Sequence, residues 1–265
     1  MEAYTGFAGV YDTFMDNIPY EEWSHYVKSL LEQQGVTEGL VVDLGCGTGK
    51  ITEQLALMGY DMIGIDNSEE MLGIAREKLM TLEETDPRKN ILYLLQDMRE
   101  MELYGTVKAA ISICDSMNYI TEEEDLYQVF SLVNNYLDQD GVFVFDLNTE
   151  YKYAEILGDC NICENREDAS FIWENYYYPE EKINEYDLTI YVRQEDQRFE
   201  RLEETHYQRA YSLEQIKELL ERAGMHFVAA YDAFTQEPPK PDSERIYVVA
   251  REGYQAGKYY ASDEK

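Results

Sequence analysis

The sequence predicts an α/β protein, in which a doubly wound, Rossmann-like sheet of seven strands carries helices on both faces. Residues 40–49 join an apolar strand to a loop with glycine at every second position, and an amphipathic helix pattern follows directly. Apolar, β-branched runs then alternate with helical patterns as far as residue 148. Period-two runs between residues 171 and 204 break this alternation, which indicates an antiparallel β insertion.

Composition limits the class of protein and its partners. A chain of 265 residues is long enough for one domain with an elaboration. It has no apolar run of membrane-spanning length and no basic region at its start, so we expect a cytoplasmic protein without membrane contact. The net charge of −32 would repel a nucleic-acid backbone from most of the surface. A nucleic-acid partner is therefore not expected.

Residues 1–36 precede the predicted sheet and contain two helical patterns separated by Pro19. The second pattern places Trp23, Tyr26, Val27 and Leu30 on one apolar stripe. We expect this stripe to pack against the core formed by residues 37–158.

The glycine loop differs from a dinucleotide fingerprint. Gly45 and Gly47 match the first two glycines of G-x-G-x-x-G, but Lys50 occupies the third position. Asp43 precedes the loop, and its carboxylate would repel a pyrophosphate but would pair with an ammonium group. S-adenosylmethionine is an amine-bearing, cationic nucleoside, so it fits better than NAD. An NAD-dependent oxidoreductase is the rival that these residues disfavour.

Residues 42–49, Val-Asp-Leu-Gly-Cys-Gly-Thr-Gly, resemble the first motif of the class I S-adenosylmethionine-dependent methyltransferases. The resemblance covers residues 38–150 strongly and 206–250 in outline. It implies transfer of a methyl group to an O, N or C atom of a small molecule, which the protein promotes mainly by positioning the reactants. An RNA methyltransferase and a non-catalytic S-adenosylmethionine-binding or interaction protein remain alternatives.

The N-terminal helices are similar to those of amino-sugar N-methyltransferases, where they close over the cofactor. By that resemblance Tyr11 and Tyr20 contact the cofactor or the substrate.

The second strand, residues 61–66, ends at Asp66, whose carboxylate can accept both ribose hydroxyls. We expect Asn67 to cap the next helix with Glu70, and the resemblance places Asn67 in the adenosine site. The third strand, residues 90–95, leads to the next candidates. The resemblance implies that Asp97 contacts the adenine amine and that Met98 packs on the ring.

The fourth strand, residues 107–115, ends where ligands bind in open α/β sheets. Cys114, Asp115, Asn118 and Tyr119 could face the transferred methyl group. Nucleic-acid amine methyltransferases have two prolines here, and this chain has none.

The fifth strand, residues 141–148, places Asp146 and Asn148 at its ligand-facing end, where they could line the substrate side. Between the two strands, Thr121 and Glu124 are the predicted cap of a helix.

The predicted site combines these positions. No residue identifies itself as a general base, and one is required only if the acceptor is protonated. Tyr11, Asp115 and His206 are the candidates for it. The predicted cofactor contacts are Tyr11, Tyr20, Asp43, Gly45, Cys46, Gly47, Asp66, Asn67, Met71, Asp97, Met98, Cys114 and Asp115.

Residues 159–210 form the predicted insertion, with strands at 171–178, 186–192 and 199–204. Small-molecule methyltransferases often carry a lid at this place, and a dimerisation sheet that makes the protein a homodimer is the alternative. Cys160 and Cys163 have no second cysteine pair to complete a zinc site, so we expect two reduced loop thiols and no metal.

Residues 211–250 return to the main sheet. Ser212 and Gln215 form a capping-box pattern that opens a helix. Strands are predicted at 227–231 and 245–250, and the resemblance implies that the last strand is antiparallel. Residues 251–265 form a polar tail.

Overall fold

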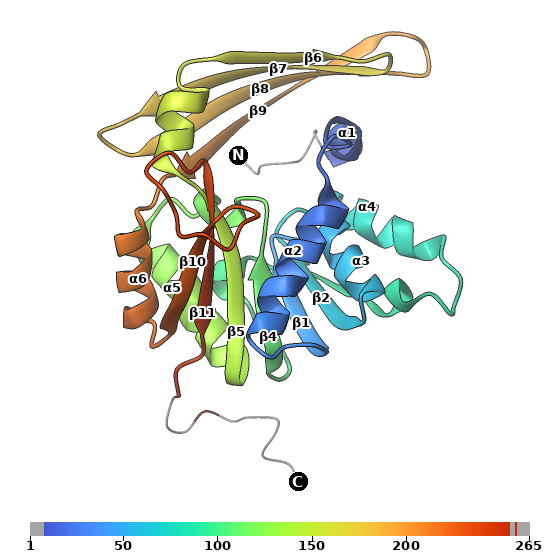
Figure 1. The fold of residues 1–265 in the computed structure, drawn as a ribbon. Coiled ribbons are helices and arrows are strands. Elements are labelled where there is room, and N and C mark those ends of the chain that lie inside the picture. Colours follow the sequence, from blue (N-terminus) through green and yellow to red (C-terminus); the bar gives the residue numbers. More distant parts are fainter. Residues whose placement is uncertain (1–7, 255–257, 259–265) are drawn as a thin grey trace.

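The computed structural model describes residues 8–254 and residue 258. It contains a seven-stranded sheet of order β10-β11-β5-β4-β1-β2-β3 and a separate four-stranded sheet (Figure 1). The predicted α/β fold with an antiparallel β insertion is therefore confirmed. The strands of the main sheet are β1 (Gly39–Leu44), β2 (Tyr60–Asp66), β3 (Leu92–Leu95), β4 (Val107–Ser112), β5 (Leu137–Asn148), β10 (His226–Asp232) and β11 (Arg245–Arg251).

Strand directions create a crevice at one edge of the main sheet. Strands β1 to β5 pair in parallel, whereas β11 is antiparallel to both β5 and β10, as predicted for the last strand. The chain order reverses between β1 and β4, because β2 lies on one side of β1 and β4 on the other. Such a reversal separates the loops that follow the two strands and leaves space for a ligand at their carboxyl ends.

Helices cover both faces of the main sheet because each presents one apolar stripe. Val27, Leu30 and Leu31 bury one side of α2 against the sheet, and Val129 and Phe130 do so for α5 on the other face. None of the helices in residues 8–254 is long and apolar enough to cross a bilayer. The helices are α2 (Tyr20–Gln33), α3 (Lys50–Leu57) and α4 (Glu69–Met80) on the first face, and α5 (Glu123–Tyr136) and α6 (Leu213–Arg222) on the second.

Helix capping confirms one prediction and corrects two. Ser212 and Gln215 form the predicted capping box of α6. The cap of α4 is Ser68, not Asn67, because Asp66 accepts the Ser68 N–H at 2.9 Å and fixes the turn one residue later. Helix α5 begins after Glu122, so the predicted cap at Thr121 is wrong.

The insertion contains four strands where the sequence pattern predicted three. The additional strand is β6, which the sequence pattern did not predict because it is short and polar and lies at the edge of the sheet. Cys163 belongs to this strand, opposite Ile172, and is therefore not a loop thiol. The strands are β6 (Asn161–Asn165), β7 (Ala169–Tyr178), β8 (Ile183–Arg193) and β9 (Phe199–Arg209), and a short π-helix, Lys152–Leu157, leads to them from β5.

Helix α1 (Ala8–Phe14) lies beneath the four-stranded sheet and connects it to the core (Figure 1). The Phe14 ring packs edge-on against Phe171 of β7, with 4.9 Å between ring centroids. On its other side, Asp12 accepts a hydrogen bond from Thr48 at 2.7 Å and forms an ion pair with Lys78 at 2.6 Å. The N-terminal region thus contacts both the insertion and the glycine loop.

The aromatic core under β5 generates a stability prediction. Phe145 is fully buried and stacks on Phe143, with 4.7 Å between ring centroids. Truncation in Phe145→Ala leaves a cavity, and we expect it to lower the free energy of unfolding by about 3–5 kcal/mol. Phe199→Ala is the matched control, because that side chain is 50% exposed and its loss should change stability by about 0.5 kcal/mol or less. Equal urea midpoints for both variants would contradict this packing.

Candidate functional site

A cavity of about 410 Å³ opens at the carboxyl edge of the main sheet, between the loops that follow β1 and β4. Its volume lies within the range of roughly 300–1,000 Å³ that is typical of small-molecule sites. The described residues that line it are Tyr11, Tyr20, Asp43, Gly45, Cys46, Gly47, Thr48, Lys50, Ile51, Ile65, Asp66, Asn67, Met71, Gln96, Asp97, Met98, Arg99, Ile113, Cys114, Ser116, Tyr119, Ile120, Thr121 and Asp125.

Two glycines shape the loop at the base of the cavity. Gly45 has a φ of 75°, and a Cβ there would lie 2.6 Å from Ser116 Oγ. The absence of a side chain therefore lets the loop pack against the turn after β4. Gly47 has a φ of 53°, and a Cβ there would meet no atom within 4 Å. This position faces open space, so a side chain would occupy volume that a ligand can use.

Three carboxylates lie at the ends of neighbouring strands and line the cavity. Asp43 on β1 accepts a hydrogen bond from Thr52 Oγ1 at 2.6 Å, and burial raises its pKa to about 7. Burial also raises the pKa of Asp66, which accepts the Gly47 N–H at 2.8 Å. The pKa of Asp97 is lowered, because the Arg99 guanidinium donates hydrogen bonds to its carboxylate.

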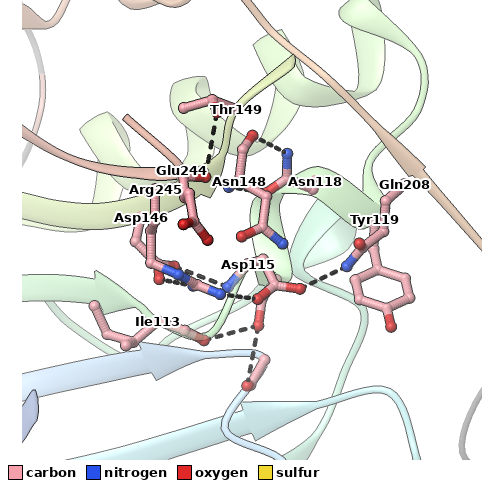
Figure 2. Close-up of polar contacts among 12 residues, drawn as sticks. Ile113, Asp115, Asn118, Tyr119, Asp146, Asn148, Thr149, Gln208, Glu244 and Arg245 are labelled. Atoms are coloured by element: carbon pink, nitrogen blue, oxygen red, sulfur yellow. Dashed lines mark hydrogen bonds and ion pairs between the residues drawn. The ribbon is translucent and has the colours of Figure 1, made fainter. Parts of the chain in front are cut away.

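The turn after β4 has an unusual backbone. Cys114 and Asp115 have φ values of 66° and 54°, in the left-handed region that residues with a side chain seldom adopt. Asp146 stabilises this turn by accepting the Asp115 N–H at 2.8 Å. Arg245 of β11 forms ion pairs with both carboxylates (Figure 2). The turn is therefore fixed by charges on β5 and β11.

The Asp115 carboxylate is occupied within the protein. It pairs with Arg245 Nη2 at 2.6 Å and accepts a hydrogen bond from Gln208 Nε2 of β9, also at 2.6 Å (Figure 2). Asp115 is not among the described residues that line the cavity. Its predicted roles as a cofactor contact and as a base thus have no support from the geometry, because both carboxylate oxygens bind other side chains.

Buried amides extend the same network to the insertion. Asn118 Nδ2 donates to the backbone carbonyl of Asn148 at 3.1 Å, and Asn118 Oδ1 accepts the Asn148 N–H (Figure 2). The same Nδ2 donates to the Arg209 carbonyl at 2.8 Å. Asp146, Asn118 and Asn148 are all at most 5% exposed. The sequence suggested these three residues for the ligand side, but the Asp146 and Asn118 side chains and the Asn148 backbone instead bind the β4 turn to β5 and β9.

The structure brings most of the predicted cofactor contacts together. Twelve of the thirteen line the cavity, and Asp115 is the exception. Tyr11 of α1 and Tyr20 of α2 reach the same cavity from the N-terminal region. His206, a candidate base, is buried on β9 and is not part of the described lining.

Some lining residues were not predicted. Several of them adjoin predicted residues in the sequence. Their short distance along the chain from the glycine loop or from Asp97 could therefore have indicated that they line the cavity. Thr121 lies just before α5 and Asp125 in its first turn, and the local pattern does not mark either as a lining residue, because the tertiary packing of α5 brings them to the cavity. The additional residues are Thr48, Lys50, Ile51, Ile65, Gln96, Arg99, Ile113, Ser116, Ile120, Thr121 and Asp125.

The charged side chains that line the cavity fit S-adenosylmethionine better than a dinucleotide. The carboxylates of Asp43, Asp66 and Asp97 line the cavity, where they can accept hydrogen bonds from an ammonium group, from ribose hydroxyls and from an amine. The lining cations already have acidic partners: Lys50 lies 3.5 Å from Asp12, and Arg99 lies 2.5 Å from Asp97. A pyrophosphate would therefore meet mainly negative charge.

Comparison with known proteins agrees with this geometry. Residues 41–141 match the family described as a methyltransferase domain. YqeM of Bacillus subtilis, which is named as a methyltransferase, is 34% identical over 94% of this chain and 96% of its own length.

Solved structures give the same result. The S-adenosylmethionine-dependent methyltransferase structure from Clostridium acetobutylicum superposes with a TM-score of 0.82 at 26% identity, over 96% of this chain and 100% of that one. CalS10 from Micromonospora echinaspora, an amino pentose methyltransferase, shares the fold with a TM-score of 0.70 at 15% identity, over 91% and 96% of the two chains. This chain belongs to the class I S-adenosylmethionine-dependent methyltransferases.

Proposed function

We propose that this enzyme transfers the methyl group of S-adenosylmethionine to an O, N or C atom of a small molecule. The observation that carries the proposal is the cover over the carboxyl edge of the main sheet, where the cavity opens (Figure 1). The four-stranded sheet lies above that edge, and its inner face contacts the β4 turn through Gln208 and His206. A covered site of this size suits a compact acceptor. CalS10, whose fold is shared, is an amino pentose methyltransferase.

Charge argues against RNA as the acceptor. The chain has 54 acidic and 22 basic residues, so most of its surface repels phosphates. Lys50 and Arg99, which line the cavity, are paired with Asp12 and Asp97. An RNA backbone would have to displace these carboxylates to reach a cation.

The lining residues suggest how the cofactor is held. Asp43 is proposed to pair with the ammonium group of the cofactor, and Asp66 is proposed to accept hydrogen bonds from the ribose hydroxyls of the cofactor. Its sulfonium supplies an electrophilic methyl group, so the contribution of the chain is mainly orientation and exclusion of water. Adenosine would then contact Asn67, Met71, Asp97 and Met98, with Gly45, Cys46, Gly47 and Cys114 along the floor and Tyr11 and Tyr20 above.

The insertion is proposed to act as the lid of this site. Its inner face is both aromatic and polar, with Trp173, Tyr186 and His206 in one stacked group. Helix α1 packs on the same sheet through Phe14 and contributes Tyr11 to the cavity. The lid and the N-terminal helix would therefore select the acceptor together.

The acceptor class can be tested by following a tritiated methyl group from S-adenosylmethionine. The probes are D-glucosamine, tyramine, catechol and bulk tRNA, each at low salt. We expect label in one or more small probes and none in tRNA, because the surface charge repels the tRNA backbone. Label in tRNA alone would contradict the proposed acceptor class.

The buried Asp43 predicts a pH-dependent affinity for S-adenosylmethionine. With a pKa of about 7, this carboxyl is mostly neutral at pH 5.5 and half ionised at pH 7, and only the ionised form pairs with an ammonium group. Isothermal titration should therefore show affinity on the order of tenfold higher at pH 7 than at pH 5.5. Asp43→Asn should bind weakly at both values. An unchanged pH dependence in this variant would contradict the assignment.

A further inference from the structure

A row of hydrogen-bonding side chains leads from the interior of the four-stranded sheet to the cavity wall. Tyr119 lines the cavity, and its Oη lies 3.2 Å from Nδ1 of His206. The other imidazole nitrogen, Nε2, lies 3.1 Å from Oε2 of Glu204. The His206 and Glu204 side chains are only 1% and 4% exposed. A carboxylate, an imidazole and a phenol thus follow one another in the direction of the cavity.

Stacking fixes the orientation of the imidazole. The Tyr186 ring stacks on His206 with 4.7 Å between centroids and 9° between planes. Trp173 stacks on Tyr186 in turn, with 4.2 Å between centroids. Tyr186 Oη also hydrogen-bonds to Tyr119 Oη. The stack fixes the plane of the imidazole, and the contacts with Tyr119 and Glu204 fix its rotation within that plane, so Nδ1 stays directed at Tyr119.

The carboxylate determines the tautomer of the imidazole. An ionised Glu204 can only accept, so His206 donates Nε2–H to it. The Nδ1 lone pair then accepts a hydrogen bond from the Tyr119 hydroxyl. This is the arrangement in which a buried acid orients a histidine so that it withdraws a proton from a hydroxyl group.

We propose that Glu204, His206 and Tyr119 form a proton relay for an acceptor that carries an N–H or O–H. This inference rests on the proposed function and narrows its acceptor class. The acceptor atom forms a bond to the methyl carbon while the sulfur–methyl bond breaks, and that electron pair goes to sulfur. The acceptor proton passes to Tyr119 Oη, and the Tyr119 proton passes to His206 Nδ1. Glu204 stabilises the resulting imidazolium.

The Glu204–His206 pair is not needed merely to connect the four-stranded sheet to the core. Gln208 already binds Asp115 at 2.6 Å, and Asn118 binds the Arg209 carbonyl at 2.8 Å. Burial of a carboxylate and an imidazole is costly unless both are paired. The connections through Gln208 and Asn118 exist without the Glu204–His206 pair. What this pair adds is a basic nitrogen that is directed at a residue of the cavity wall.

The tautomer gives a test that does not depend on an acceptor. The chain has only three histidines, so ¹⁵N-histidine labelling and single His→Gln variants can assign each ring in the complex with sinefungin. The relay predicts that His206 carries its proton on Nε2, with Nδ1 unprotonated, and that the Nδ1 resonance shifts in Tyr119→Phe. A proton on Nδ1, or an imidazolium throughout, would overturn it.

Kinetics test the chemical step with D-glucosamine and catechol. His206→Gln and Tyr119→Phe keep much of the side-chain volume but remove the basic nitrogen and the phenolic oxygen. We expect kcat to fall about 100-fold or more, as for loss of a general base, with acceptor KM and cofactor affinity within about threefold. His25→Gln, an exposed position on α2, is the matched control and should retain full activity.

The outcomes separate the relay from a structural role and from the proposed function. Loss of cofactor affinity and of Tm together with kcat in both variants would overturn the relay, as would an unchanged kcat. If the wild-type enzyme methylates neither probe nor any other small acceptor, the proposed function fails. The ¹⁵N measurement still decides the relay in that case, because it reports the tautomer without turnover.

Discussion

The cavity depends on one ion cluster, Asp115–Arg245–Asp146, in which Asp146 is fully buried and the other two side chains are partly buried. The turn after β4 takes left-handed backbone angles at Cys114 and Asp115, and such angles persist only when the surroundings stabilise them. Arg245 supplies that stabilisation from β11, since it pairs with both carboxylates while Asp146 accepts the Asp115 N–H. Removal of one partner from a buried pair leaves an uncompensated charge. The antiparallel last strand therefore holds the wall of the site as well as the sheet.

The same turn links the site to the four-stranded sheet. Asp115 accepts a hydrogen bond from Gln208, Asn118 donates to the Arg209 carbonyl, and Tyr119 contacts His206. These partners on β9 lie on the insertion, so a shift of the insertion would change the surroundings of residues beside the cavity. Helix α1 makes a second link, because Phe14 packs on the insertion while Asp12 binds Thr48 of the glycine loop. Under the proposed function, acceptor access and cofactor enclosure would thus be physically coupled.

The sequence predicted the features whose signal is local. Residues 40–49 and the alternating apolar runs predicted the sheet, its parallel strands and the cofactor class, because period and glycine spacing determine backbone geometry directly. Strand β6 was missed because its short polar sequence carries no alternation. Asp115 was assigned to the ligand, but its partners Gln208 and Arg245 lie about 90 and 130 residues further along the chain. Pairings of that kind arise from tertiary packing, so local patterns do not reveal them.

The most direct test is a crystal structure of the enzyme with sinefungin, in which an amine replaces the sulfonium-bound methyl group. The account predicts that the nucleoside lies between Asp66 and Asp97, with its amino-acid end at Asp43 and the replacing amine directed toward Tyr119. In this position the acceptor space lies beneath the four-stranded sheet. A ligand bound outside the cavity, or one whose amine points away from Tyr119 toward open solvent, would contradict it.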